Sequence, residues 1–220
     1  EQVRQGLGEL RPSTPLLFMQ SHGGLTHAGS FQGKDSILSG PAGGVVGMVE
    51  TGKSAGFEQL IGFDMGGTST DVSLFNGDLE RTSASVVSGV RITAPMLRIE
   101  TVAAGGGSIL TFASSRLQVG PESAGATPGP ACYRNSGPLT ITDANVVLGR
   151  IQADYFPQVF GATGDQPIDV GKVAEEFELL ADSVAATSDD PKSIHDLAAG
   201  FLRIVVERMA NAIKKVSIQR

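Results

Sequence analysis

Two carboxylates bracket a glycine-rich turn in residues 61–71, which read IGFDMGGTSTD. An apolar run ends at Asp64, and Asp71 follows a set of small residues: Gly66, Gly67, Thr68, Ser69 and Thr70. Consecutive backbone N–H groups in such a turn form a concavity that binds anions such as phosphate. Carboxylates suit a hydrated Mg²⁺, which is usually held through one or two acidic groups and the phosphates themselves. The stretch predicts a nucleotide site, with Asp64 and Asp71 as candidate catalytic and metal-binding residues and residues 66–70 on the phosphate.

The same stretch also fits an ordinary hairpin turn, because Gly, Asp and Thr are common turn residues. A second glycine run favours the nucleotide interpretation. Residues 101–108 read TVAAGGGS, an apolar strand that ends in Gly105, Gly106 and Gly107. Glycine lets a backbone approach a ligand without a Cβ in the way. We therefore predict that these glycines also contact the nucleotide, and the small apolar residues around them disfavour a merely mobile loop.

Other residues carry weaker predictions. Residues 39–44, SGPAGG, would either aim a helix N-terminus at an anion or allow close packing, and the sequence leaves both open. Cys132 is expected to be a small buried hydrophobe rather than a nucleophile, since no histidine lies near it in sequence. The histidines at positions 22, 27 and 195 lack the spacing of metal ligands. The sequence contains no Walker motif, and its glycine runs do not fit the Rossmann motif.

Composition narrows the class of protein. The 220 residues are 40% hydrophobic, which suits one large domain or two small ones. The 17 basic and 23 acidic residues give a net charge of −6, which supplies no electrostatic footprint for nucleic acid or for an anionic membrane. No apolar run is long enough to predict a transmembrane helix. The single cysteine allows no internal disulfide, so we expect a cytoplasmic protein.

Hydrophobic periodicity predicts an α/β layer structure. The expected strands are residues 16–20, 60–63, 72–75, 84–92 and 97–102, with Pro95 as the break between the last two. The expected helices are residues 42–55, 144–149, 170–180 and 193–216. Their start signals are Ser39, Thr142 with Asp143, and the run 188–191, and Gly56 ends the first helix. Apolar residues at 194, 197, 198, 201, 205, 209, 213 and 216 give the last helix one buried face. Residues 104–168 are expected to form an inserted loop-rich lobe.

Taken in order, these motifs resemble those of the hydantoinase/oxoprolinase family. The matching segments cover nearly the whole chain and are residues 18–21, 31–47, 62–72, 101–108, 119–126, 128–133, 142–145 and 210–215. The resemblance implies an actin-like (ribonuclease H-like) ATPase fold with a mixed sheet and flanking helices. It also implies that residues 1–220 are one domain fragment, the second phosphate-binding half, because family members carry an earlier Asp-x-Gly-Gly-Thr turn that is not in these residues.

The chemistry implied by the resemblance is ATP-dependent hydrolysis of a cyclic amide, in which 5-oxo-L-proline becomes L-glutamate while ADP and phosphate are released. ATP, Mg²⁺ and K⁺ are the implied cofactors. The implied partners are the cyclic amide and the remaining domains or a second subunit, in a homo-oligomer when complete. On this view the fragment alone does not hydrolyse ATP.

Substrate and role stay open at this stage. Glu100 stands where the family pattern leads us to expect His, which puts the identity of the substrate in question. The alternatives are an N-methylhydantoinase or ketone carboxylase subunit, and a non-catalytic nucleotide-binding or assembly module. A sugar-kinase-like phosphotransferase is disfavoured, because that pattern has no place for residues 104–168.

Overall fold

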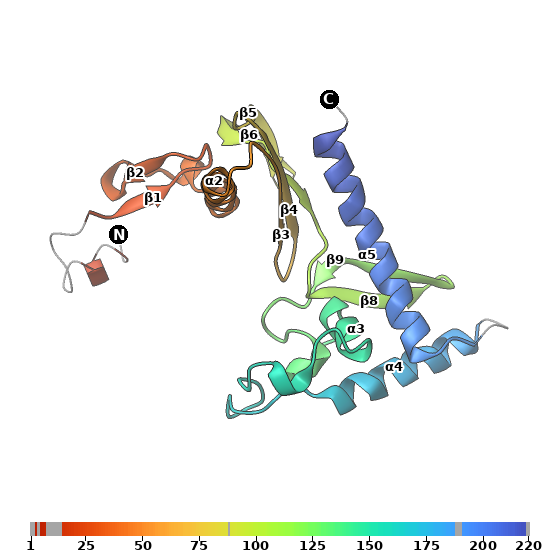
Figure 1. The fold of residues 1–220 in the computed structure, drawn as a ribbon. Helices are drawn as coiled ribbons and strands as arrows, with labels where there is room; N and C mark the ends of the chain where they lie inside the picture. The colour runs from red at the N-terminus through yellow and green to blue at the C-terminus, as the bar shows by residue number, and fades with distance from the viewer. Residues whose placement is uncertain (1–2, 4, 8–14, 88, 188–190, 219–220) are drawn as a thin grey trace. The chain divides into compact units, whose positions relative to one another are not determined.

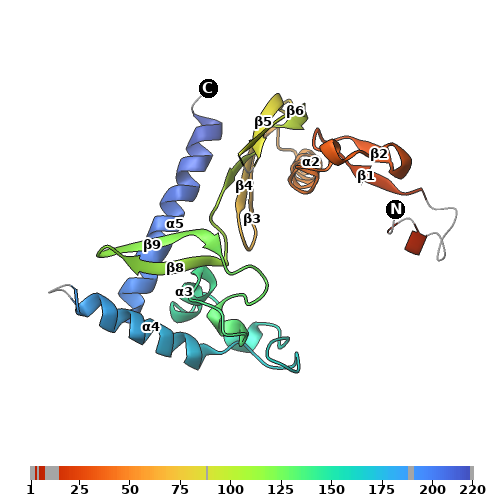
Figure 2. The same cartoon turned by 180° about the vertical axis from the view of Figure 1, so that it is seen from behind.

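The computed structural model describes residues 3, 5–7, 15–87, 89–187 and 191–218 (Figures 1 and 2). The chain forms two compact units. The first unit contains residues 1–64, 71–100 and 216–220, and the second contains residues 65–70 and 101–215. A hairpin therefore gives its strands to the first unit and its turn to the second.

The described part of the first unit consists mainly of short hairpins and one long helix, and residues 5–7 are also helical. Its strands are β1 (Leu17–Met19), β2 (Leu25–His27), β3 (Gln59–Met65), β4 (Thr70–Asn76), β5 (Arg81–Val87) and β6 (Val90–Leu97). The short strand β7 (Glu100–Val102) begins in the first unit at Glu100 and continues into the second. Apart from residues 5–7, the helices of the first unit are the short 3₁₀ helices η1 (Ala28–Ser30) and η2 (Gly33–Asp35) and the α-helix α2 (Ser39–Ser54). The pairs β1–β2 and β5–β6 are antiparallel, and a three-stranded sheet has the order β3-β4-β7. β3 and β4 each extend beyond the ranges expected from sequence.

Helix α2 begins differently from the prediction. Leu38, not Ser39, is the N-cap, and it makes no side-chain cap. Ser39 already belongs to a turn, because its N–H donates to Ser36 O at 3.2 Å. A distant residue, Ser21, provides the acceptor for the Leu38 N–H at 3.0 Å, which no local pattern contains. The predicted end is confirmed: the Gly56 N–H donates to Lys53 O, and its φ of +85° is one that glycine adopts readily.

The boundaries predicted for two strands, residues 84–92 and 97–102, are wrong. The expected strand 84–92 is a hairpin, β5–β6, whose turn includes Gly89 at a φ of +80°. Pro95 lies inside β6 rather than ending a strand. It is tolerated there because the β5–β6 register shifts between Thr82 and Ala84, so that Pro95, which has no N–H to donate, lies at the irregularity and is paired with no residue of β5. The expected strand 97–102 divides between the end of β6 and β7.

The second unit has one hairpin and three α-helices among its described residues. Its elements are β8 (Ser108–Ala113), β9 (Arg116–Ser123), η3 (Ala131–Tyr133), α3 (Ile141–Val147), η4 (Ala153–Tyr155), α4 (Val170–Ala185) and α5 (Ile194–Ser217). β8 and β9 are antiparallel, and α3 packs against both α4 and β8 (Figures 1 and 2). The predicted lobe of residues 104–168 thus contains a hairpin that was not expected. Helix α3 starts earlier than expected, because Thr140 rather than Thr142 is its N-cap.

The core of the second unit lies between α3, α4, α5 and the hairpin. Phe177 of α4 and Phe201 of α5 are fully buried in it. The predicted apolar face of the last helix is confirmed, because Leu197, Ala198 and Val205 are also buried. The predicted start signal at residues 188–190 lies outside the described residues. The start that the structure shows is a capping box, in which the Ser193 N–H and hydroxyl both donate to Asp196. No described helix is both long enough and apolar enough to cross a membrane.

Candidate functional site

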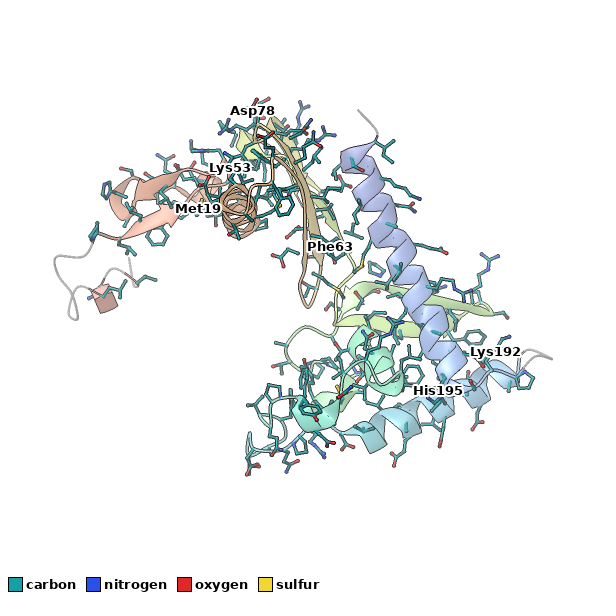
Figure 3. All side chains as sticks on the ribbon, in the orientation of Figure 1. Met19, Lys53, Phe63, Asp78, Lys192 and His195 are labelled. Carbon is teal, nitrogen blue, oxygen red and sulfur yellow. The ribbon has the colours of Figure 1, made fainter. Side chains whose placement is uncertain are left out.

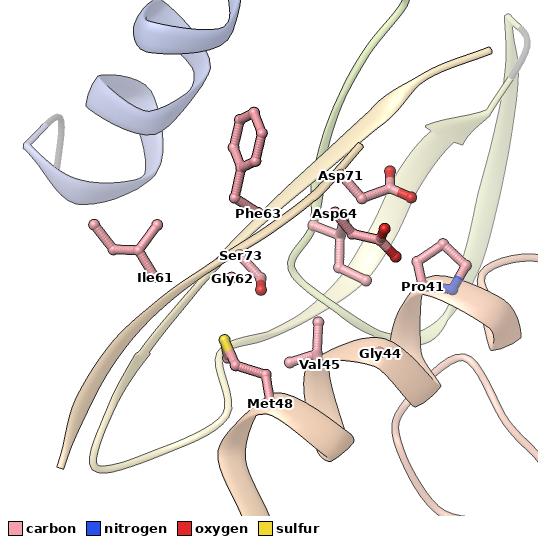
Figure 4. Close-up of a pocket in the computed structure, with 11 residues that line it drawn as sticks. Pro41, Gly44, Val45, Met48, Ile61, Gly62, Phe63, Asp64, Asp71 and Ser73 are labelled. Carbon is pink, nitrogen blue, oxygen red and sulfur yellow. The ribbon is translucent and has the colours of Figure 1, made fainter. Parts of the chain in front are cut away.

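Asp64 and Asp71 line one pocket of the first unit. The pocket has a volume of about 290 Å³ and lies between α2 and the β3–β4 hairpin. Both carboxylates are drawn on the side of the hairpin that faces α2 (Figure 4). Val45 and Met48 of α2 and Ile99 supply apolar wall. The structure therefore brings together the two acidic residues that the sequence predicts, at the rim of a small cavity.

The pocket forms where α2 and β3 lie alongside each other with matched residue spacing. Along β3, alternate residues face α2: Leu60 lies over Gly52, Gly62 over Met48, and Asp64 over Gly44. Four helical residues rise about 6 Å and two strand residues about 6.6 Å, so the partners stay matched along both elements. Glycine at position 62 leaves room for both neighbours, because a Cβ there would clash with the hydroxyl oxygen of Ser73 and would lie 2.8 Å from the sulfur of Met48. A Cβ on Gly44 would lie 3.7 Å from Asp64 Oδ2, so glycine keeps the space beside this carboxylate open.

Ser73 is a site residue that the sequence reasoning missed. It is only 5% exposed, yet it lines the pocket beside Gly62 (Figure 4). Residues two apart on a strand share one face. The spacing of Asp71 and Ser73 on β4 was therefore the signal that would have found it.

The side chains of Ile61 and Phe63 project from the other face of the hairpin, although both residues also contribute to the lining of the pocket (Figure 4). Ile61, Phe63 and Met65 are 48%, 45% and 42% exposed, and Phe63 projects from the strand in Figure 3. Unlike these exposed residues of β3, Met19 of β1 is partly buried and packs against the core formed by Ala42, Val45 and Leu97.

The glycine turn itself belongs to the second unit. It is closed by the Gly66 N–H, which donates to Ser69 O at 2.8 Å. The Thr70 hydroxyl, fully buried, donates to Ala104 O at 2.6 Å and fixes the exit of the turn. Among the described residues, no protein acceptor receives the N–H groups of Gly67, Thr68 or Ser69. Gly67 and Thr68 are exposed, so these donors are free to meet an anion.

The second glycine run contacts this turn directly. The Gly106 N–H donates to Gly66 O at 3.0 Å, and the Gly107 N–H donates to Gly67 O at 2.6 Å. The Gly105 N–H donates to the hydroxyl of Ser108 at 2.9 Å. All three N–H groups are therefore satisfied within the protein. The predicted contact of this run with a nucleotide stays a prediction, and what the structure shows is a platform that holds the turn by its carbonyl oxygens.

The start of α3 holds the platform in turn. The Thr142 N–H and hydroxyl both donate to Gly106 O, at 2.8 and 2.9 Å. Next to it, Asp143 is fully buried and accepts from the N–H groups of Ala131, Cys132 and Thr140. The Thr140 hydroxyl also donates to Asp143, at 2.8 Å. Sequence reasoning identified Thr142 and Asp143 only as a helix start and missed the hydrogen bonds from Thr142 to the glycine run.

The remaining candidates are Cys132, the histidines and the stretch 39–44. Burial raises the pKa of the Cys132 thiol, and the negative charge of Asp143 adds to the effect, so the sulfur stays protonated and unreactive. This agrees with the predicted hydrophobic role. His195 lies in the first turn of α5 (Figure 3), and the His22 ring forms a hydrogen bond of 3.0 Å with the side chain of Gln20. The stretch 39–44 supplies Pro41 and Gly44 to the pocket, and anion binding there stays a prediction.

The described residues contain no group of three or more His, Cys, Asp or Glu side chains able to hold a metal ion. Two carboxylates without a third ligand do not make an all-protein cage. They do fit Mg²⁺, which keeps several waters and takes its other ligands from phosphate.

Comparison with known proteins identifies what this arrangement resembles. The sequence model of a family described as Hydantoinase/oxoprolinase matches residues 1–220. The chain is 48% identical over 209 residues to 5-oxoprolinase 1 of Arabidopsis thaliana, covering 92% of this chain and 16% of that protein. Its fold is similar to nucleotide-free acetone carboxylase, with a TM-score of 0.82, 25% identity and coverage of 97% of this chain and 29% of the other. The ATP-dependent caprolactamase from Pseudomonas jessenii gives a TM-score of 0.76 at 30% identity, with coverage of 99% and 31%.

The chain spans only 16% of the length of the Arabidopsis relative. Any activity of the whole enzyme is therefore a proposal for these residues. The likeness to the two solved structures shows a mixed α/β fold shared with parts of those enzymes.

Proposed function

The chain belongs to the hydantoinase/oxoprolinase family, and on that premise we propose that it supplies the phosphate-binding turn of an ATP-dependent enzyme that opens a cyclic amide. One observation carries the proposal. The carbonyl oxygens of Gly66 and Gly67 are tied to the protein, while the N–H groups of Gly67, Thr68 and Ser69 meet no protein acceptor among the described residues. A turn held in this way has its donors already aligned for a phosphate.

The flanking carboxylates take the second role in the proposal. Asp64 and Asp71 each lie within two residues of the turn in sequence, and both line the acidic pocket. They would hold waters of a phosphate-bound Mg²⁺, which when bound offsets the charge of the triphosphate. The Thr68 and Ser69 hydroxyls are further donors for phosphate oxygens. Gly105, Gly106 and Gly107 keep the turn in place.

The coupling to ATP has a chemical reason. An unstrained amide is a poor electrophile, and transfer of a phosphoryl group to its oxygen makes ring opening feasible. The protein contributes mainly by positioning the reactants and stabilising charge on the transferred group. An actin-like ATPase fold would suit this role, and the likeness to two ATP-using enzymes supports it.

The substrate that the relatives favour is 5-oxo-L-proline, since several of them are named 5-oxoprolinases. Caprolactam and acetone are the alternatives that the two solved structures suggest. Further parts of an enzyme of that length, or a second subunit, would supply the rest of the site. We propose that residues 1–220 alone bind Mg-ATP without hydrolysing it, and that the complete enzyme is a homo-oligomer that also requires K⁺.

Isothermal calorimetry on the 220-residue chain tests the phosphate site. We expect Asp64→Asn to weaken Mg-ATP binding by about tenfold, or roughly 1.4 kcal/mol. ATP without Mg²⁺ should bind no more weakly to the variant than to wild type, because the lost carboxylate only repels the bare phosphate. Asp78→Asn is the matched control, since Asp78 is an exposed acid that follows the other end of β4 (Figure 3). Equal loss in both variants would show that net charge, not the site, governs binding.

A substrate panel tests the chemistry. An enzyme of the relatives' length that carries these residues should release phosphate from ATP when given 5-oxoproline, more than when given hydantoin, caprolactam or acetone. Robust Mg²⁺-dependent ATP hydrolysis by residues 1–220 alone would contradict the proposal that they form half of a site.

A further inference from the structure

We propose that Thr142 is a positioning residue for the phosphate turn, acting through the peptide that joins Gly106 to Gly107. The proposal rests on the proposed function for its consequence in binding. Its structural part stands independently on the contacts of the second unit, where all of these residues lie.

A single peptide plane connects Thr142 to the turn. The Gly106–Gly107 peptide is trans, so its C=O and its N–H point in opposite directions. On one side the C=O accepts both the N–H and the hydroxyl of Thr142, at 2.8 and 2.9 Å. On the other side the N–H donates to Gly67 O at 2.6 Å. Whatever fixes the direction of this C=O therefore also aims the N–H at the turn.

This peptide needs an external support because both of its residues are glycines. Without a Cβ on either side, the backbone has access to many more φ/ψ combinations than any other pair of residues. Replacing either glycine to reduce that freedom would crowd the contacts of this peptide. A Cβ on Gly106 would lie 3.0 Å from the Thr142 hydroxyl oxygen, and one on Gly107 would lie 3.0 Å from Gly67 O. The close approach of this peptide to Gly67 therefore favours glycine at both positions. Because two glycines leave the peptide plane free to rotate, another residue has to hold it in place.

Thr142 is itself held rigidly. It is the second residue of α3, between the N-cap Thr140 and Asp143, which form a capping box. Asp143 is fully buried and also accepts the N–H groups of Ala131 and Cys132. The start of α3 is thus tied on two sides, and its position is passed to Gly106 and then to Gly67.

The test uses Thr142→Val, which keeps the β-branched shape and removes the hydroxyl, and Thr142→Ser, which restores it. Thr187→Val is the matched control, because the Thr187 hydroxyl donates to Val184 O at the end of α4, outside this network. Amide hydrogen exchange, read by NMR, follows Gly106 and Gly107. We expect their exchange to be about tenfold faster in Thr142→Val, near wild type in Thr142→Ser, and unchanged in Thr187→Val.

The same variants separate this inference from the proposed function. If wild type binds Mg-ATP, Thr142→Val should weaken binding by about tenfold and Thr142→Ser should restore it. If wild type does not bind Mg-ATP but the exchange of Gly106 and Gly107 still responds, the support by Thr142 stands and the proposed function fails. Unchanged exchange at both glycines in Thr142→Val overturns the inference, as does a rise that is equal throughout the second unit, since that would be general destabilisation.

Discussion

Gly105→Ala tests whether the glycine run is needed for the approach of the turn. A Cβ built on Gly105 would lie 2.7 Å from Gly66 O and from the carbonyl carbon and oxygen of Gly67. Ordinary contacts begin at about 3.4 Å, so one backbone segment has to withdraw by about 0.7 Å. Because every one of these neighbours is a backbone atom, no side-chain rotation can relieve the contact.

The withdrawal acts on the hydrogen bonds that hold the turn. The bond from the Gly106 N–H to Gly66 O is already 3.0 Å long, so it would exceed the range of about 2.7–3.2 Å typical of N–H···O bonds. Overpacking of this kind costs about 1–3 kcal/mol. We therefore expect Gly105→Ala to lower the free energy of unfolding of the second unit by about 1–3 kcal/mol and to weaken Mg-ATP binding.

Urea unfolding followed by tyrosine fluorescence reports on the second unit, because Tyr133 and Tyr155 both belong to it and the sequence has no tryptophan. Gly47→Ala is the matched control. Gly47 lies inside α2, and a Cβ on it would meet no atom within 4 Å. Circular dichroism should show that this control is neutral or more stable by about 0.5–1 kcal/mol. The reasoning is refuted if Gly105→Ala unfolds at the same urea concentration as wild type and keeps the wild-type amide exchange of Gly106 and Gly107.

Three further outcomes are expected. Phe177→Ala should cost the second unit about 3–5 kcal/mol because its ring is fully buried, whereas Leu179→Ala on the same helix, 62% exposed, should stay within about 0.5 kcal/mol in the same urea assay. Burial raises the pKa of the Cys132 thiol, so a thiol reagent at pH 8 should react only as fast as the unit unfolds, and rapid labelling of the native chain would contradict this. Hydrogen bonds from Ser193 lower the pKa of Asp196 below its ordinary 3.8. The stabilising effect of the Asp196 carboxylate is thus present above about pH 4 and is lost as the pH falls through the pKa of Asp196 in the folded protein. The difference in free energy of unfolding between wild type and Asp196→Asn should therefore shrink on acidification. A difference that does not change with pH would contradict this prediction.

Elements with a local cause were predictable from the sequence. The last helix carries its own 3.6-residue period, and Gly56 ends α2 through its own backbone conformation. The strand predicted over residues 84–92 was wrong because apolar residues lie on both sides of the short hairpin turn, and Gly89 inside the turn was not taken as the end of a strand. The N-cap at Ser39 was wrong because the acceptor for the start of α2 comes from Ser21, far away in sequence.

The site divides in the same way. Asp64 and Asp71 were found because their acidity and spacing are visible in sequence, and Ser73 was within reach of the same two-residue period. The role of Thr142 could not be predicted from the sequence, because the Gly106 carbonyl to which it donates is 36 residues away. The glycine run shows a further limit, since the absence of a Cβ allows close approach without saying whether a ligand or the protein's own backbone approaches.

The residues of the stretch 61–71 depend on different packing in each of the two units. The hydrogen bonds that hold the turn come from Ala104, Gly106 and Gly107 in the second unit, whereas the space around Asp64 depends on Gly44 and the rest of α2 in the first unit. Substitutions in the platform should therefore change phosphate binding with or without Mg²⁺. Substitutions of α2 beside the pocket should change only the part that depends on Mg²⁺. A single stretch of eleven residues thus looks like one motif in the sequence, yet its two functions depend on packing that its own residues do not determine.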